Sequence, residues 1–141
     1  MNNIKFRIWD AYLKRMTYDY PPHQKLTVAF CGGKLSQVRY DDNDSGCSWS
    51  AMPDDLERGE RFFAQQYVGL RDSADQEIYE GDILMSTPAD EKHIALISYS
   101  EEFAAFLHGE NALWRGWLGK SLVLGNIFEN PELLNAKDVL N

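Results

Sequence analysis

The stretch "QQYVGLRDSADQEIYEGDILM", residues 65–85, decides how the rest of the chain is interpreted. It places two glycines, several turn formers and the triplet Glu80-Gly81-Asp82 between apolar residues. Its central "RDSADQE" predicts a turn, because short polar side chains of this kind hydrogen-bond their own backbone. The apolar residues on either side predict β-strands that enter and leave this turn.

The Glu-Gly-Asp triplet admits a chemical and a structural interpretation. In the first, Glu77, Glu80 and Asp82 gather on a metal ion or act as an acid/base cluster. However, no histidine lies nearby in the sequence, and a glycine between two strand residues is typical of a bend or bulge. We therefore favour a sheet corner in which Tyr79 buries its ring, Gly81 supplies an unusual backbone angle and Asp82 ties down the turn.

Outward from this stretch, the chain is a series of short β-rich runs separated by turn formers. "IKFRIW" (4–9) alternates between apolar and polar residues, which is typical of a half-buried strand, and it opens a hairpin over residues 1–19. Residues 61–130 carry further runs of this kind and predict the β core. Residues 40–60 are rich in Asp, Asn, Ser, Gly and Pro and predict a long surface loop. We expect one domain over residues 1–141, mostly β (α+β), with a small barrel-like or rolled antiparallel sheet.

Two segments carry helix signals. "SYSEEFAAFLHGE" fits a helix capped by Ser100, or a strand with Phe103 and Leu107 on one face, and the pattern slightly favours a strand at 101–108. "NPELLNA" predicts a short helix that begins the C-terminal segment 131–141, with Asn130 as its cap and Pro131 in its first turn.

Charge is distributed unevenly along the 141 residues, whose formal net charge is −8. Residues 1–39 hold seven Lys/Arg and two acids, whereas residues 40–141 hold seven bases and twenty acids. The acidic total disfavours nonspecific binding to nucleic acid, because phosphate contacts need clustered Lys and Arg. The basic segment is expected to lie against the acidic remainder of its own domain, or to dock on a second copy or another partner.

The cellular compartment is inferred from what the chain lacks. No apolar run approaches the roughly 20 residues that span a bilayer, and the start lacks the apolar core of a secretory signal. We therefore expect a cytoplasmic protein with no membrane contact. Cys31 and Cys47 are expected to be free thiols; a disulfide between them, or zinc ligation together with His23, has poor spacing.

Three further motifs resemble binding or catalytic sites. "DDNDSG" (41–46) begins like a calcium loop, but the twelfth position, which needs a glutamate, is Met52. The three histidines show no spacing typical of a catalytic triad. "LWRGWLGK" (113–120) predicts either a turn whose tryptophans pack on the core or an aromatic platform for a nucleobase or protein partner. The platform would consist of Trp114, Arg115 and Trp117.

Three blocks of the chain resemble the YopX family of phage and prophage proteins. They are "KFRIWD" with "KRMTY" (5–10 and 14–18), "QYVGLRDSADQEIYEGDIL" (66–84) and "LGNIFENPELL" (124–134). They occur in the family's order, which makes the match more specific than any short motif. Within these blocks Asp75 replaces a family glycine, Val68 a common Thr and Phe128 a Tyr.

The resemblance implies a small, mostly β protein of a bacterial host's phage-derived DNA, without an assigned activity and oligomeric in some cases. We interpret the motif positions as structural and assign no catalytic, cofactor or metal residue. These positions are Trp9, Gly69, Asp72, Tyr79, Glu80, Gly81, Asp82, Gly125, Asn126 and Asn130. The favoured function is a non-catalytic module that binds itself or a phage or host protein; the alternatives are a single-stranded nucleic-acid-binding β-barrel and, less favoured, a metal-dependent hydrolase.

Overall fold

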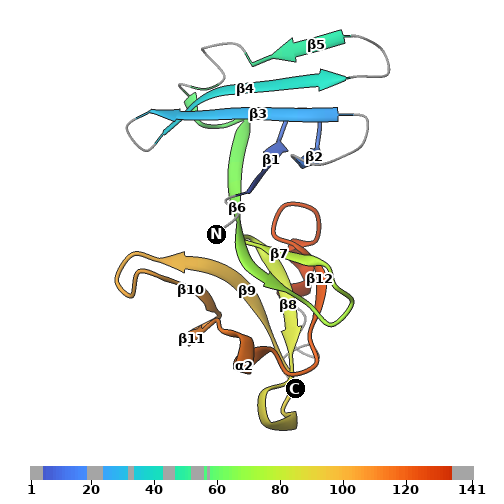
Figure 1. Ribbon diagram of the computed structural model, residues 1–141, viewed down its shortest axis with the longest axis vertical. Helices are drawn as coiled ribbons and strands as arrows, with labels where there is room; N and C mark the ends of the chain where they lie inside the picture. Colours follow the sequence, from blue (N-terminus) through green and yellow to red (C-terminus); the bar gives the residue numbers. More distant parts are fainter. Residues whose placement is uncertain are drawn as a thin grey trace. The chain divides into compact units, whose positions relative to one another are not determined.

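The computed structural model describes residues 5–18, 24–31, 34–42, 47–51, 56 and 58–134. The chain divides into two compact units (Figure 1). The N-terminal unit comprises Lys5–Gln65, and the C-terminal unit comprises Gln66–Asn141 with Met1–Ile4. That the chain behaves as one domain stays a prediction.

Six strands contribute to the N-terminal unit. Strands β1 (Phe6–Asp10) and β2 (Arg15–Tyr18) form the predicted hairpin, and β1 lies beside the first part of β6 (Phe62–Arg71). Strands β3 (Gln24–Cys31), β4 (Lys34–Asp42) and β5 (Cys47–Ser50) form an antiparallel sheet in that order. Their common core is apolar and buried, and consists of Ile8, Leu26, Val38 and Phe62.

The prediction of one long surface loop over residues 40–60 is wrong. Strand β4 extends to Asp42, and β5 pairs with it over Cys47–Ser50. Ala51 and Leu56 pack against the core of this unit. The polar composition of residues 40–60 predicted a loop, but backbone hydrogen bonds can hold a strand that has no alternating apolar residues. Residues 43–46, which begin like a calcium loop, lie outside the described residues together with Met52 and His23, as do the side chains of Cys47 and Trp49.

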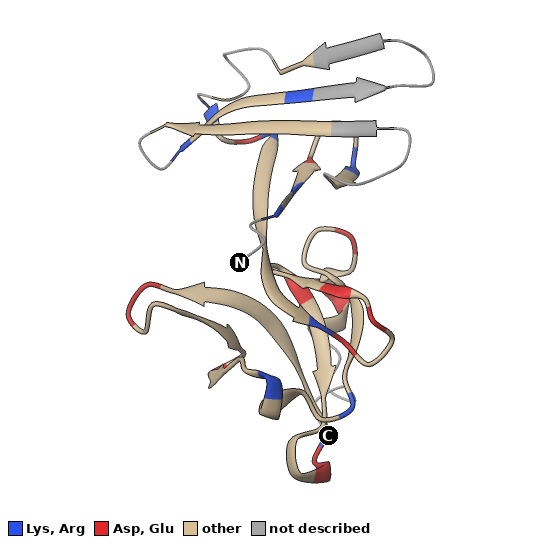
Figure 2. Ribbon diagram, in the orientation of Figure 1, with Lys and Arg blue, Asp and Glu red and all other residues tan. Residues whose placement is uncertain are grey.

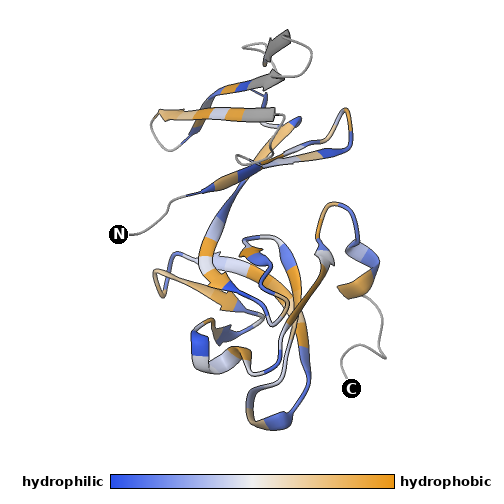
Figure 3. Ribbon diagram, turned by 45° about the vertical axis from the view of Figure 1, so that its right-hand side comes forward, coloured by the Kyte–Doolittle hydropathy of each residue, from blue (hydrophilic) through white to orange (hydrophobic). Residues whose placement is uncertain are grey.

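A five-stranded antiparallel sheet builds the C-terminal unit. Its order is β11-β10-β9-β8-β12, and β7 (Glu77–Tyr79) pairs with the last part of β6. The five strands are β8 (Asp82–Ser86), β9 (His93–Ser100), β10 (Ala105–His108), β11 (Asn111–Ala112) and β12 (Leu122–Asn126). Figure 3 shows hydrophobic residues along these strands. The buried core consists of Ile78, Leu84, Ile97 and Leu118.

Short helical turns complete the C-terminal unit: η1 (Pro88–Asp90), α2 (Arg115–Leu118) and η2 (Pro131–Leu134). The predicted fold class is therefore confirmed, because the protein is mostly β with a curled antiparallel sheet, an N-terminal hairpin and a short C-terminal helix. Among the described residues, no helix has the length and apolar character needed to cross a membrane.

Side chains at their ends show how the two segments with helix signals fold. At 101–108, residues 101–104 form a turn and only Ala105–His108 is a strand, because Ser100 Oγ accepts the Phe103 N–H at 3.2 Å. The terminal helix is a 3₁₀ helix, and the Asn130 side chain does not cap it in the predicted way. Asn130 Oδ1 instead accepts the Asn126 N–H at 3.3 Å, so the side chain faces back towards β12.

Candidate functional site

The Glu-Gly-Asp triplet forms the corner between β7 and β8. Asp82 Oδ2 accepts the Tyr79 N–H at 2.7 Å, and both residues are buried. Gly81 has φ +88°, a backbone angle that glycine adopts without steric cost. Its N–H donates to Ile97 O at 2.8 Å, and its carbonyl accepts the Ile127 N–H at 2.9 Å. The corner is thereby joined to β9 and to the residue that follows β12.

The three carboxylates that sequence reasoning grouped together do not converge. Asp82 binds Tyr79 N–H, whereas Glu80 Oε1 accepts the Gln66 N–H at 3.4 Å. Glu77 accepts the Tyr79 hydroxyl at 3.3 Å and lies 3.5 Å from the Arg71 guanidinium. Within the described part of the chain, no group of three or more His, Cys, Asp or Glu side chains is placed to hold a metal ion.

Asp72 joins the turn after β6 to strand β12. Its Oδ1 accepts the N–H groups of Ala74 and Gln76, both at 2.9 Å, and its Oδ2 accepts the Val123 N–H at 2.9 Å. Beside it, Ser73 Oγ accepts the Ser121 N–H at 2.8 Å. The local bonds of this turn were foreseeable from sequence, but the bonds to residues about 50 positions away were not.

Asp75 closes this turn with φ +64°, the left-handed conformation expected at the position of the family's glycine. Replacing Asp75 with glycine should raise the free energy of unfolding by about 0.5 kcal/mol, because the left-handed strain exceeds the entropy cost of glycine. The weak ion pair with Arg71, at 3.9 Å and highly exposed, contributes little against this. Urea denaturation of Asp75→Gly and Asp75→Ala measures the effect; an equal loss of stability in both variants would contradict it.

The remaining motif residues are also placed by backbone geometry. Gly69 lies in β6 with φ +88°, between the two register positions at which β6 pairs with β7. A Cβ added to Gly125 would collide with the Asn130 side chain. Asn126 Oδ1 accepts the N–H groups of residues 128 and 129, at 3.0 and 2.9 Å. In the N-terminal unit, Trp9 is buried on β1 opposite residue 16.

The predicted aromatic platform is divided between the interior and the surface. Trp117 is half-buried, and its indole N–H donates to His108 Nδ1 at 2.9 Å. Trp114 is 61% exposed, and its ring lies over the short helix α2, because a Cβ added to Gly116 would collide with it. Arg115 is exposed between them.

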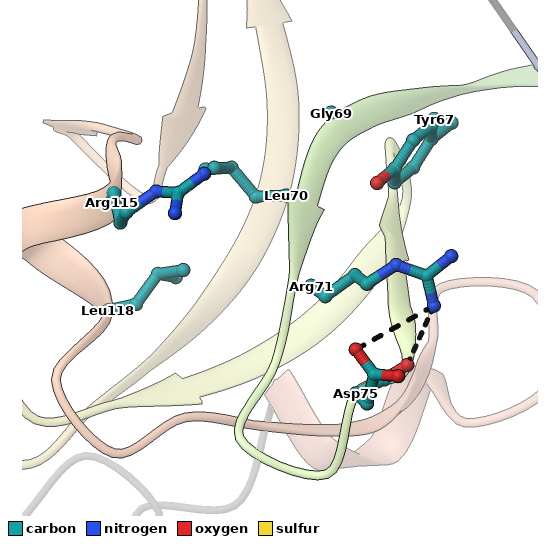
Figure 4. Close-up of a pocket in the computed structure, with 7 residues that line it drawn as sticks. All are labelled: Tyr67, Gly69, Leu70, Arg71, Asp75, Arg115 and Leu118. Carbon is teal, nitrogen blue, oxygen red and sulfur yellow. Dashed lines mark hydrogen bonds and ion pairs between the residues drawn. The ribbon is translucent and has the colours of Figure 1, made fainter. Parts of the chain in front are cut away.

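A hollow of about 420 Å³ lies beside Arg115 in the C-terminal unit (Figure 4). Seven residues from β6, the following turn and α2 line it: Tyr67, Gly69, Leu70, Arg71, Asp75, Arg115 and Leu118. In Figure 4, Arg115 points towards Leu70, whereas Arg71 points towards Asp75. An Arg71 Nη1 bond of 2.9 Å to the Asp75 carbonyl holds it there. The two guanidinium groups therefore do not converge on one anion.

His108 is a buried polar residue that sequence reasoning missed. It is 1% exposed, its Nε2 lies 2.6 Å from Leu84 O, and its Nδ1 accepts the Trp117 indole N–H. This arrangement requires a neutral ring with the proton on Nε2. Ser86 Oγ lies 3.4 Å from Nδ1 but is itself buried, so the pair presents no nucleophile to solvent.

Acidification should destabilise the C-terminal unit through His108. Burial lowers the pKa of His108 below 6.5; the hydrogen bond to Leu84 opposes this shift and the nearby His93 adds to it. Below about pH 6.5 the unfolded chain binds a proton that the folded chain does not, so stability falls as pH falls, by at most about 1.4 kcal/mol per pH unit. Urea denaturation between pH 7 and pH 5 should show a shallower slope for His108→Gln than for His93→Gln. Equal slopes would contradict the prediction.

The N-terminal unit contains a buried ion pair at the base of its hairpin. Asp10 is 0% exposed and accepts Arg61 through both oxygens, with Nε to Oδ1 and Nη2 to Oδ2 both at 3.0 Å. Asp10 Oδ1 also accepts the N–H groups of Tyr12 and Leu13, at 3.0 and 3.2 Å. Burial raises the pKa of Asp10, but the hydrogen bonds from Arg61, Leu13 and Tyr12 outweigh it, so the pKa lies below 3.8.

The three sequence blocks form β1–β2, the β6–β8 corner and the segment from β12 to η2. A model of the YopX protein family matches residues 5–135, which is most of the chain. The chain belongs to the YopX family. Two solved structures are similar to this YopX family member over nearly its full length. No curated protein matches it.

Protein EF1440 from Enterococcus faecalis is 25% identical to the chain, with a TM-score of 0.56; the match covers 95% of this chain and 99% of that one. Protein yopX from Bacillus subtilis is 16% identical, with a TM-score of 0.60, and the match covers 94% and 98% of the two chains. At this level of identity, the likeness to yopX shows a shared fold and nothing more.

Proposed function

We propose that this YopX family member is a non-catalytic protein-interaction module, encoded by phage or prophage DNA, that binds itself or a phage or host protein. One observation carries the proposal: the motif carboxylates are engaged in turns, while large apolar side chains are exposed. The described residues expose Tyr12, Leu13, Phe30, Tyr99, Phe103, Trp114, Leu122 and Leu124. Exposed aromatic and aliphatic groups beside charged residues are the usual anchors of protein interfaces.

Sedimentation equilibrium of the full chain tests this function. We expect the weight-average mass to rise above that of the monomer between about 10 µM and 1 mM, the range in which small interfaces of this kind associate. A strictly monomeric chain over that range, together with no phage or host protein that binds it after purification from lysogenic cells, would overturn the proposal.

Single-stranded nucleic acid is the second candidate, and the exposed ring of Trp114 beside Arg115 favours it. A flat, exposed indole and a neighbouring guanidinium are the groups on which nucleobases stack. The formal net charge of −8 opposes it. Fluorescence anisotropy with labelled oligonucleotides at about 20 mM salt distinguishes the two functions. Binding lost in Trp114→Ala/Arg115→Ala and kept in the matched surface variant Phe103→Ala would support it, and no binding by the wild type would remove it.

A further inference from the structure

Two hairpins, one in each unit, have turns of the same length. The turn between β1 and β2 and the turn between β9 and β10 each contain four residues, 11–14 and 101–104. In both, the fourth residue adopts a left-handed backbone, with φ +52° at Lys14 and +50° at Ala104.

The last strand residue before each turn accepts hydrogen bonds from backbone N–H groups of the turn. Asp10 Oδ1 accepts the N–H groups of Tyr12 and Leu13. Ser100 Oγ accepts the N–H of Phe103 at 3.2 Å. Because these bonds exist within each unit, the turns are pre-organised, and binding would lose less conformational entropy than the ordering of a flexible loop.

The first turn and its neighbour form a surface that we call the basic tip, residues 12–15. Tyr12 and Leu13 are 57% and 58% exposed, and Lys14 and Arg15 are exposed beside them. In Figure 2, the start of β2 is blue. The basic tip thus combines two apolar side chains with two positive charges.

The second turn forms the acidic tip, residues 99–103. Tyr99 and Phe103 are 47% and 66% exposed, and Glu101 and Glu102 are exposed between them. Figure 2 shows this turn in red. Tyr99 also packs edge-on against Phe106 of β10, with ring centroids 5.3 Å apart, which fixes its position. The acidic tip therefore carries two apolar side chains and two negative charges.

We propose that the basic tip of one copy of this chain docks on the acidic tip of a second copy. The occupant is identified by complementarity: two apolar side chains meet two, and two cations meet two carboxylates. Such an arrangement, with apolar contacts inside and charges at the rim, is that of a protein interface. A nucleic acid would be repelled by the acidic tip. The inference rests on the proposed function and names the surfaces through which self-association occurs.

The two tips are small, so the contact is weak and depends on salt. An interface well below about 1,000 Å² is typical of transient association. Exposed charge pairs are screened within about 8 Å at physiological ionic strength. Self-association is therefore expected at tens to hundreds of micromolar and to weaken at least about fivefold between 50 and 500 mM salt.

Charge reversal with compensation tests the contact in sedimentation equilibrium of the full chain. Lys14→Glu/Arg15→Glu gives a chain with two acidic tips, and Glu101→Lys/Glu102→Lys gives a chain with two basic tips. Each variant alone should associate at least about tenfold more weakly than the wild type. An equimolar mixture of the two variants should recover association, as should the fourfold variant, whose net charge equals that of the wild type.

Matched controls separate a contact at the tips from a general effect of charge. Lys92→Glu/Lys120→Glu and Glu110→Lys/Glu132→Lys make the same charge changes at exposed positions outside the tips, and should leave association within about twofold of the wild type. Circular dichroism and thermal melting confirm that each variant is folded. Leu13→Ser/Phe103→Ser, which changes no charge, should also weaken association.

The outcomes distinguish this inference from the proposed function. If the wild type associates and both tip variants associate equally well, the tip contact is wrong while self-association stands. If the wild type stays monomeric at every concentration and salt, both the tip contact and the self-association that it would serve fail. If the mixture of variants does not recover association although each variant is folded, complementarity between the tips is excluded.

Discussion

Replacing Asp10 with alanine is expected to lower the free energy of unfolding of the N-terminal unit by about 3–5 kcal/mol, because it leaves a partly buried guanidinium without its carboxylate. The carboxylate is fully buried and accepts Arg61 through both oxygens. Its loss also deprives Tyr12 and Leu13 N–H of their acceptor. Urea denaturation followed by far-UV circular dichroism measures the change.

Two comparisons make the Asp10 prediction specific. Arg61→Met together with Asp10→Ala should cost less than the sum of the two single changes, because the double variant leaves no unpaired charge. The exposed Glu60 in the same unit provides the control, and Glu60→Ala should change stability by less than about 0.5 kcal/mol. A loss below about 1 kcal/mol in Asp10→Ala would show that the buried pair does not hold the hairpin.

The pH dependence of this unit follows from the same carboxylate. Since the pKa of Asp10 lies below 3.8 in the folded chain, its contribution is complete above about pH 3.8 and is lost as pH falls through the lower folded pKa. The wild type should therefore lose stability in this acid window more steeply than Asp10→Ala.

Asp72→Ala should destabilise the C-terminal unit by about 3 kcal/mol, since three backbone N–H groups lose a charged acceptor. Asp72 is 7% exposed, so water does not replace the carboxylate freely. Asp72→Asn should show an intermediate loss, because the amide keeps one oxygen for Ala74 and Gln76 but offers no acceptor to Val123. Urea denaturation of the two variants measures this order.

Amide hydrogen exchange can show which hydrogen bond of Asp72 is lost in the Asp72→Asn variant. In Asp72→Asn, protection of the Val123 N–H should fall more than protection of the Gln76 N–H, because only the former loses its partner. Equal changes at both amides would contradict the assignment. Ser73→Ala removes the neighbouring bond to the Ser121 N–H and should leave the exchange of Gln76 nearly unchanged.

The stretch at 65–85 shows which structural features can be predicted from residue types that are close together in the sequence. Gly81 with φ +88°, Asp75 with φ +64° and the short bond from Tyr79 N–H to Asp82 are all local, within a few residues, and could be inferred from turn chemistry. The bond from Val123 to Asp72 spans 51 positions and carries no mark in either segment. The bond between Asp72 and Val123 could therefore be found only in the folded structure.

Amino-acid composition did not predict the strands that are held mainly by backbone hydrogen bonds. The stretch 40–60 looked like a loop, but β4 and β5 pair across it through main-chain hydrogen bonds. His108 likewise gave no periodic signal, and only the sheet places Leu84 O and the Trp117 indole around its ring. Trp114 and Trp117, three residues apart in one motif, were separated into surface and interior by α2.

The mostly β architecture, the unusual backbone angles at Asp75 and Gly81 and the YopX resemblance could be inferred from residue types alone, because strand alternation and turn geometry depend on neighbouring residues. The folded chain was needed to see that Glu77, Glu80 and Asp82 do not converge, that Asp10 pairs with Arg61, and that two four-residue turns expose opposite charges. Those relations join residues far apart in the chain, and their energies arise from burial and distance, which exist only after folding.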